Sequence, residues 1–325
     1  MVVSPLVSVV IPTRNRRALL AQTVDSVLRQ TYTRWELVVV DDKSDDDTWA
    51  WLQSINDDRV RKIHRDQHSE RSKTRNIGFA ASQGEYVLFL DDDDLLTEQA
   101  LATHVAALTQ HPTAVASIGS YLMFDADGNE EAMQIVRRPM LRNLWQEFLF
   151  GWMATAGHSL FRRSLLTTLG GWNEAYSFGE DHELWLRAAR IGPIALLPEM
   201  VLKFRVHSGQ VRPQQSRQLL TELRQRSIES LSDEPRARGR AVLTARELEA
   251  QAADCFERAR AGRALYYYLR IAVLAPRLFV SPLTRMKLLI PALKCLFGNV
   301  GLRAMRGVLA WRRRRNNLDH APSRF

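Results

Sequence analysis

The chain has 325 residues, of which 46% are hydrophobic and 25% are charged. This is the composition of an ordinary globular protein, long enough for one large core or two domains, and it excludes a disordered, collagen-like or disulfide-stapled chain. The two cysteines, Cys255 and Cys295, lie in no CxxC or Cys/His spacing. The sequence therefore predicts neither a disulfide framework nor a cysteine-based zinc site.

The net charge of +9 is unevenly distributed along the chain. Residues 1–235 contain 26 Lys and Arg against 31 Asp and Glu, whereas residues 236–325 contain 19 against 5. From Arg258 to Arg315 there are 14 basic residues and no acidic residue. The positive charge therefore belongs to one C-terminal segment, which predicts two functional regions.

The N-terminal residues lack the basic start of a signal peptide, and no stretch approaches the roughly 18 uninterrupted apolar residues of a membrane span. We therefore expect a protein that is not exported and that works in a reducing, cytoplasmic setting.

Short apolar runs rich in β-branched and aromatic residues predict four strands, at residues 6–11, 36–40, 59–63 and 86–90. Helical periodicity between and after them predicts helices at residues 17–30, 48–55, 72–83 and 98–110. Apolar strands that alternate with helices form a parallel sheet covered on both faces, and ligands bind at the carboxyl ends of its strands. The residues directly after each strand are therefore the first candidates for function.

Beyond Pro112 the pattern is typical of an α+β half. Residues 115–124 predict a strand, Asp127-Gly128 predicts a hairpin turn, and residues 181–191 predict an amphipathic helix. Residues 207–235, rich in Gln, Arg and Ser, predict a connector.

Residues 241–316 predict a mostly helical segment with breaks at Pro276, Pro282 and Pro291. Its helices interleave aromatic and aliphatic residues with Arg and Lys, and they end in Arg312–Arg315. Cationic amphipathic helices of this kind bind the headgroup region of an anionic membrane. The alternative is an appendage that packs on the rest of the protein or on another subunit. We do not expect nucleic-acid binding, because no base-reading module accompanies the charges.

Three polar segments follow predicted strands and should meet at one edge of the sheet: residues 12–16 (PTRNR), 41–45 (DDKSD) and 91–94 (DDDD). Four adjacent carboxylates repel one another, which favours either full solvation or neutralisation by a divalent cation. Oxygen ligands without His or Cys nearby suit Mg²⁺ or Mn²⁺. The alternative is a solvated acidic turn that caps the helix beginning near Thr97.

Asp42 follows the second predicted strand, where its carboxylate can accept an N–H from a nucleobase edge, with Thr13 and Arg14 nearby. The alternative is an Asx-turn or a helix cap. Arg75 lies in a basic run at the start of a predicted helix, where it can approach phosphates or simply form part of a solvated face.

A second acidic pair, Glu180-Asp181, opens the predicted helix at 181–191. Asp181 is the candidate general base, because one carboxylate at the edge of a cleft can take a proton from an attacking hydroxyl. The alternative is that these carboxylates only complement the positive end of the helix macrodipole. His207 ends another predicted strand, where it completes a metal shell or forms a structural hydrogen bond. Two roles are expected for Trp145, Trp152 and Trp172: they stack on a sugar, or they pack in the core.

Five sequence blocks occur in an order and spacing that resemble a known family: VSVVIPTRNR, WELVVVDDKSDDDT, SKTRNIGFAASQGEYVLFLDDDD, LGGWNEAYSFGEDHELWLR and FRVHSG. Over about residues 5–210 the chain resembles the inverting family-2 glycosyltransferases of GT-A fold. The resemblance implies an α/β fold with a nucleotide-sugar-binding mixed sheet flanked by helices, here followed by a C-terminal α-helical extension. It also implies a nucleotide-diphosphate sugar donor, a Mn²⁺ or Mg²⁺ ion, and transfer to an acceptor hydroxyl with inversion.

The resemblance implies roles for individual residues as well. Asp181, in the ED block, matches the catalytic base, and Lys43 replaces the small residue usual in the family, which leaves the base of the nucleotide open. The implied nucleotide-binding residues are Pro12, Thr13, Arg14, Asp42, Arg75 and Asp92. The implied metal ligands are Asp91 and Asp93 of a DxD motif together with His207, with Asp92 and Asp94 as the alternative register.

We therefore divide the chain into a nucleotide-sugar-binding half (1–112), an acceptor-binding and catalytic-base half (113–210), a connector (211–240) and a basic helical extension (241–325). The expected function is a metal-dependent inverting glycosyltransferase, peripheral on the inner face of the cell membrane, that acts on a glycan or lipid-linked acceptor in bacterial polysaccharide or lipopolysaccharide synthesis. The alternatives are a non-catalytic nucleotide-sugar or glycan-binding module on the same fold, and a scaffold in which the C-terminal helices are the functional part.

Overall fold

The computed structural model describes residues 4–207, 216–229, 231–258, 260–281, 283–284 and 287–295. The chain forms two compact units. The first comprises Met1–Phe148 and Met153–Leu231, and the second comprises Leu149–Trp152 and Ser232–Phe325.

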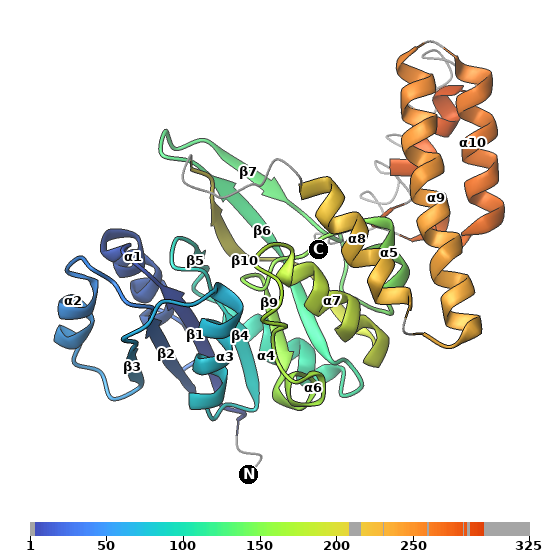
Figure 1. The fold of residues 1–325 in the computed structure, drawn as a ribbon. Helices are drawn as coiled ribbons and strands as arrows, with labels where there is room; N and C mark the ends of the chain where they lie inside the picture. The colour runs from blue at the N-terminus through green and yellow to red at the C-terminus, as the bar shows by residue number, and fades with distance from the viewer. Residues whose placement is uncertain are drawn as a thin grey trace, which may run out of the picture. The chain divides into compact units, whose positions relative to one another are not determined.

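The first unit begins with a four-stranded parallel sheet in the spatial order β3-β2-β1-β4 (Figure 1). Its strands are β1 (Val7–Thr13), β2 (Trp35–Asp41), β3 (Val60–His64) and β4 (Tyr86–Phe89). They alternate with the helices α1 (Arg17–Leu28), α2 (Thr48–Ser54) and α3 (Arg71–Ala81). The predicted strands and helices of this half, and their parallel pairing, are confirmed.

The sequence explains this packing. All seven residues of β1 are buried, as expected for a strand covered on both faces. Helix α1 turns Leu20, Val24 and Val27 toward the core at helical spacing. Helix α3 comes close to β1 at Gly78, where a Cβ atom would overlap the side chain of Val10.

The sheet continues beyond β4 as a mixed sheet in the order β4-β9-β6-β10-β5. Strand β9 is antiparallel to both of its neighbours, and β10 runs parallel to β6. These strands are β5 (Leu95–Leu96), β6 (Ala116–Phe124), β9 (Ser159–Arg162) and β10 (Ile194–Arg205), with β7 (Glu130–Met133) on β6 and β8 (Met140–Arg142) on β10. The helices of this half are α4 (Ala100–Gln110), α5 (Trp145–Phe150), α6 (Arg163–Leu169), α7 (Glu180–Ile191) and α8 (Ser216–Glu229).

Helix α8 corrects one prediction, because it lies inside the segment that we expected to be a connector. Among its many Gln, Arg and Ser residues, α8 has apolar residues that face the core. Leu223 and Ile228 are buried, and Leu220 and Leu223 lie beside the start of α7 at Gly179. Local composition is thus overridden by an amphipathic face that packs on α7.

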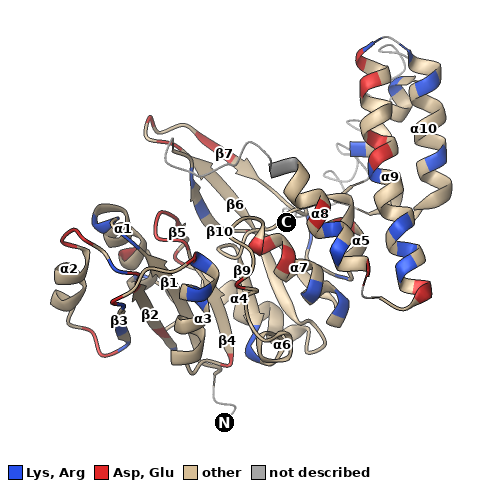
Figure 2. Cartoon of the chain, viewed as in Figure 1, with Lys and Arg blue, Asp and Glu red and all other residues tan. Residues whose placement is uncertain are grey.

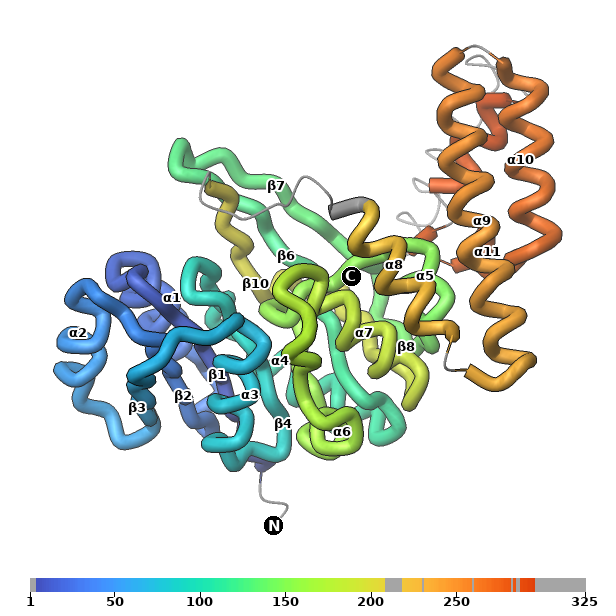
Figure 3. Tube along the Cα trace, viewed as in Figure 1, coloured from blue at the N-terminus to red at the C-terminus, as the bar shows by residue number. Residues whose placement is uncertain are grey.

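The second unit is helical. Helices α9 (Asp233–Glu257) and α10 (Ala261–Leu274) pack against each other and are followed by α11 (Arg277–Val280) (Figure 3). The predicted break at Pro276 is confirmed. The predicted break at Pro291 is wrong, since residues 287–295 are helical throughout. Pro282 and residues 296–325 lie outside the described residues.

Within the part of the chain that the structure describes, no helix is both long enough and apolar enough to span a membrane.

Candidate active site

The three polar segments predicted to share one edge of the sheet lie together. Strands β1 and β2 pair in register up to Thr13 and Asp41, so their following loops leave the sheet at the same end. The Asp42 N–H donates to the Thr13 carbonyl at 2.9 Å, and the Thr13 hydroxyl donates to Asp92 Oδ2 at 2.8 Å. Thr13, the last residue of β1, thus connects the segments that follow β2 and β4.

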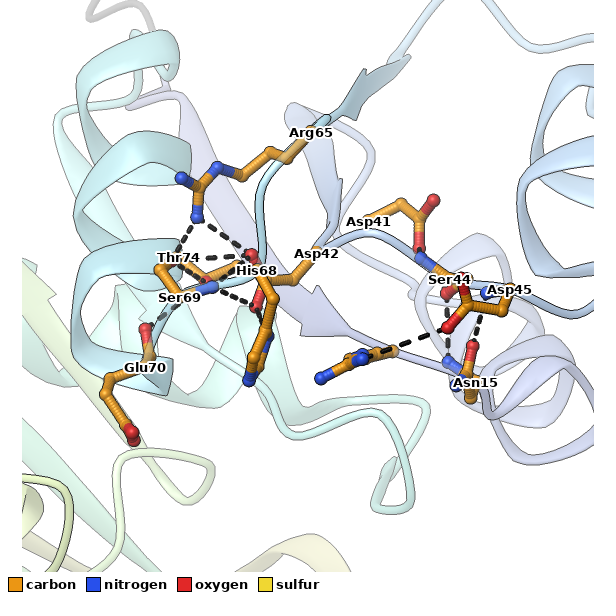
Figure 4. Close-up of polar contacts among 11 residues, drawn as sticks. Asn15, Asp41, Asp42, Ser44, Asp45, Arg65, His68, Ser69, Glu70 and Thr74 are labelled. Atoms are coloured by element: carbon orange, nitrogen blue, oxygen red, sulfur yellow. Dashed lines mark hydrogen bonds and ion pairs between the residues drawn. The ribbon is translucent and has the colours of Figure 1, made fainter.

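The carboxylate of Asp42 is enclosed by donors from the segment after β3 (Figure 4). Arg65 Nη1 donates to Oδ1 at 2.8 Å, His68 Nδ1 lies 2.6 Å from Oδ2, and the Ser69 N–H donates to Oδ2 at 3.0 Å. The Asp42 side chain is only 6% exposed. Beside it, His64, Arg65, Asp66 and Gln67 line an open depression of about 340 Å³.

Hydrogen bonds between main-chain N–H groups and side-chain oxygens join the loops after β1 and β2 (Figure 4). Asn15 N–H donates to Ser44 Oγ at 2.9 Å, and the Asp45 N–H donates to Asn15 Oδ1 at 2.7 Å. Lys43 has a φ of 62°, in the left-handed region that favours Gly.

Each residue of the run Asp91–Asp94 forms a hydrogen bond or an ion pair. Asp91 accepts from Arg75 Nη2 at 2.6 Å, and Asp94 accepts from the Arg205 N–H at 2.9 Å. Arg16 Nη1 bridges Asp92 and Asp93, at 3.1 and 2.7 Å. The acidic cluster is therefore folded into the site rather than exposed as a solvated turn.

The electrostatics differ from one carboxyl group to the next. Burial raises the pKa of Asp92 to about 6, although Arg16 and Thr13 lower it. Burial, together with Asp91 and Asp93, raises the pKa of Asp94 well above its usual value. Burial opposes ionisation of Asp91 as well, but the charges of Arg75 and Arg71 outweigh it and lower its pKa.

Arg75 connects this cluster to helix α7. Its guanidinium is 1% exposed and donates to Asp91 on one side and to Glu180 Oε1, at 3.2 Å, on the other. Its Cζ lies 4.3 Å from the ring centre of Trp172. Trp172 is itself 2% exposed and packs edge-on against Phe89, so it is a core residue that supports Arg75.

Asp181 lies next in the chain, at the N-terminus of α7, which starts after Gly179 in the left-handed conformation. Its Oδ1 atom is buried and has no hydrogen-bond partner among the described residues. Burial raises the pKa of Asp181 to about 7, while Arg75 lowers it. A buried carboxylate with an unused oxygen and a pKa near neutrality is the arrangement expected of a general base.

The candidate metal ligands only partly come together. His207 Nε2 lies 2.9 Å from Asp93 Oδ2, whereas Asp91 is engaged by Arg75. The described residues contain no ready group of three or more His, Cys, Asp or Glu side chains for a metal. One carboxylate and one imidazole still fit a Mn²⁺ or Mg²⁺ ion whose other ligands are water and substrate oxygens.

The remaining predicted nucleotide-binding residues lie beside this edge. Pro12 is buried within β1, and Arg14 forms a surface ion pair with Asp45 at 3.8 Å. Sequence reasoning missed Arg65 and His68, and it gave no role to Arg16 in the polar segment 12–16 or to Glu180 in the acidic pair. Arg16 and Arg65 follow strands at the carboxyl edge, which was the available signal, whereas the partners of His68 and Glu180 depend on tertiary contacts.

A parallel sheet extended by antiparallel strands, with an acidic cluster and a buried carboxylate at its carboxyl edge, defines a protein of GT-A fold. TarS residues 1–349 of S. aureus share this fold, with a TM-score of 0.62, 18% sequence identity and 89% coverage of both chains. Residues 8–170 match the profile of the family described as Glycosyl transferase family 2. The chain belongs to this family, which confirms the predicted resemblance and fold class.

Curated relatives agree with this assignment. Glycosyltransferase GlyG of Streptococcus pneumoniae is 33% identical over 129 residues, which cover 39% of this chain and 42% of GlyG. An uncharacterised glycosyltransferase of Haemophilus influenzae is 26% identical over 217 residues, which cover 63% of this chain and 67% of the relative. The Campylobacter jejuni protein named GalNAc(5)-diNAcBac-PP-undecaprenol beta-1,3-glucosyltransferase is 29% identical over 194 residues, which cover 56% of this chain and 59% of the relative. The chain thus spans 42% to 67% of the length of these relatives.

Proposed function

We propose that this protein transfers a sugar from a nucleotide-diphosphate sugar to an acceptor hydroxyl with inversion at the anomeric carbon, and that Asp181 is its general base. The observation that carries the proposal is the buried Oδ1 of Asp181, which has no hydrogen-bond partner among the described residues and whose carboxyl group feels the charges of Arg75 and Asp91. Family membership supports the reaction class.

Asp42 and Thr13 would hold the nucleoside. The donors around Asp42 fix its carboxylate in one orientation, so that it can accept an N–H from the base, with Pro12 near the end of β1 and Arg14 just after that strand. Asp92, fixed by Thr13, would face the ribose. A nucleotide-sugar donor is supported by the fold shared with TarS, of which complexes with UDP-GlcNAc and UDP are known.

Asp93 and His207, with Asp91 beside them, would hold a Mn²⁺ or Mg²⁺ ion. When bound, such an ion supplies Lewis-acid stabilisation of the charge that grows on the departing diphosphate. Arg75 would add a second positive charge from a position that Glu180 and Trp172 keep fixed.

In the reaction, Asp181 would remove the proton of the acceptor hydroxyl as its oxygen bonds to the anomeric carbon, and the bond from that carbon to the phosphate oxygen would break on the opposite face. Attack opposite the leaving group inverts the configuration. General-base catalysis of this kind contributes about 10²–10⁴-fold to the rate.

We further propose that the acceptor is a glycan of a bacterial surface polysaccharide or lipopolysaccharide. The name of the Campylobacter jejuni relative, which describes a glycan on PP-undecaprenol, supports a lipid-linked acceptor.

The test is a screen of the purified chain against a panel of nucleotide sugars with Mn²⁺ or Mg²⁺, read by thermal shift and by slow donor hydrolysis. We expect one donor to stabilise the protein and to be consumed only when the metal is present. In Asp93→Ala, added metal should no longer produce either the stabilisation or the consumption. Asp127→Asn, in the exposed turn between β6 and β7, is the control that should behave as wild type. Donor binding without turnover would instead support a non-catalytic binding module, and the absence of any donor response would overturn both.

A further inference from the structure

Helix α10 is apolar on two opposite sides. One side, with Ala264, Tyr268 and Ile271, is buried in the second unit, where α10 packs on α9. The opposite side exposes Tyr266, Leu269 and Val273, which are 56%, 58% and 82% exposed. These three positions follow the i, i+3, i+7 spacing of a single helix face. A solvent-facing side would ordinarily carry polar residues there.

Arginines border the exposed apolar residues. Arg263 and Arg270 are exposed and lie seven residues apart, so they occupy the same side of the helix, and Arg270 Cζ lies 5.8 Å from the ring centre of Tyr266. We refer to Arg263, Tyr266, Leu269, Arg270 and Val273 as the α10 outer face. Figure 2 shows that α10 contains basic and no acidic residues.

We propose that the α10 outer face docks on an anionic lipid surface, with Tyr266, Leu269 and Val273 in the headgroup region and the two arginines at the lipid phosphates. An exposed apolar stripe flanked by cationic residues is the pattern of a helix that lies in the plane of a membrane interface. Aromatic residues such as Tyr266 suit that boundary because they present an apolar ring with a polar tip.

Charge decides among the possible occupants. From Arg258 to Arg315 the sequence has 14 basic residues and no acidic one, so a second copy of this segment would bring positive charge against positive charge. A nucleic-acid backbone would satisfy the arginines but would leave the central Leu269 and Val273 without an apolar partner. An anionic bilayer accommodates both kinds of side chain. The docking surface does not depend on the proposed reaction.

The test uses the full chain in sedimentation with vesicles of phosphatidylcholine alone or mixed with phosphatidylglycerol. We expect binding to the anionic vesicles, and a loss of at least about tenfold in the partition coefficient for Leu269→Asp/Val273→Asp and for Arg263→Glu/Arg270→Glu. Matched controls are Ile191→Asp, at an apolar residue 52% exposed on α7, and Arg238→Glu, whose side chain is 55% exposed on α9. Both should bind as wild type.

A second readout does not depend on loss of binding. A polarity-sensitive dye on Val273→Cys, compared with the same dye on Arg238→Cys, should shift to the blue with anionic vesicles only at position 273. Variants of the outer face that bind anionic vesicles as wild type would overturn the proposal. It would also fail if these substitutions abolished self-association in light scattering while vesicle binding stayed unchanged, because the face would then be a contact between copies.

Discussion

At the scale of single residues, the buried carboxyl group of Asp181 leads to a prediction about pH. A general base works when it is deprotonated, and burial raises the pKa of Asp181 to about 7. The rate of sugar transfer should therefore rise about tenfold per pH unit below 7 and level off above it. The measurement is kcat from pH 5.5 to 9 at saturating donor and metal. A rate that is constant across pH 6 to 8 would exclude Asp181 as the titrating base.

Arg16 gives a second prediction at this scale. Its guanidinium bridges Asp92 and Asp93, so it competes with any cation that binds Asp93. Arg16→Ala should tighten the binding of Mn²⁺ to the donor-free protein by about two- to fivefold, because a partly exposed ion pair contributes about 1 kcal/mol or less. Titration followed by electron paramagnetic resonance measures the affinity.

The neighbouring Arg17 supplies the control for this experiment. It pairs with Asp47 at 3.2 Å, and both side chains are largely exposed, at 47% and 68%. Arg17→Ala removes the same charge from a side chain that pairs with Asp47 instead of Asp93, and it should leave Mn²⁺ binding unchanged. Equal tightening in both variants would show a general charge effect rather than competition at Asp93.

At the scale of elements, Arg75 on α3 joins the end of β4 to the start of α7. Arg75→Ala would leave the buried Glu180 and the half-buried Asp91 without their shared counter-charge, and we expect it to lower the free energy of unfolding by about 3–5 kcal/mol. Arg71→Ala, from the same helix, removes a partner of Glu180 that is 53% exposed and should cost less than about 1 kcal/mol. Urea unfolding measures both, and similar losses for the two variants would contradict the role given to Arg75.

The elements also show what a sequence can predict. Strands β1 to β4 and helices α1 to α4 follow from apolar runs and helical spacing, because each buries a long face of its own. Strands β5 and β8, of two and three residues, are too short to leave a pattern and exist through their pairing with β10. Helix α8 was not predicted because its sequence is rich in polar residues.

The site shows the same division. The positions of Asp42, Asp93 and Asp181 could be predicted because they follow strands or open a helix. The bridge from Arg16 to Asp93 and the enclosure of Asp42 by Arg65 and His68 could not, because they join residues 77, 23 and 26 positions apart, and only the folded chain brings these together.

At the scale of the whole molecule, charge separates the two regions of the chain. Residues 236–325 carry 19 basic against 5 acidic residues, whereas the candidate donor site lies in residues 1–235, with 26 against 31. Raising NaCl from 0.1 to 1 M shortens the Debye length from about 10 to about 3 Å, which weakens exposed charge interactions far more than buried ones.

Vesicle binding should therefore fall at least about tenfold over this range of salt, while the affinity for the donor changes by less than about threefold. Sedimentation and donor titration of the same preparation give the two numbers. A parallel fall of both would mean that the donor also depends on the exposed charges, contrary to the buried contacts of Asp42 and Asp92.

The most direct test of the catalytic account compares binding with turnover in Asp181→Asn. This substitution keeps the shape of the side chain and removes the proton acceptor. We predict a dissociation constant for the donor within about threefold of wild type and a transfer rate lower by at least about 10². A transfer rate equal to that of the wild type would contradict the central claim that Asp181 takes the proton of the acceptor.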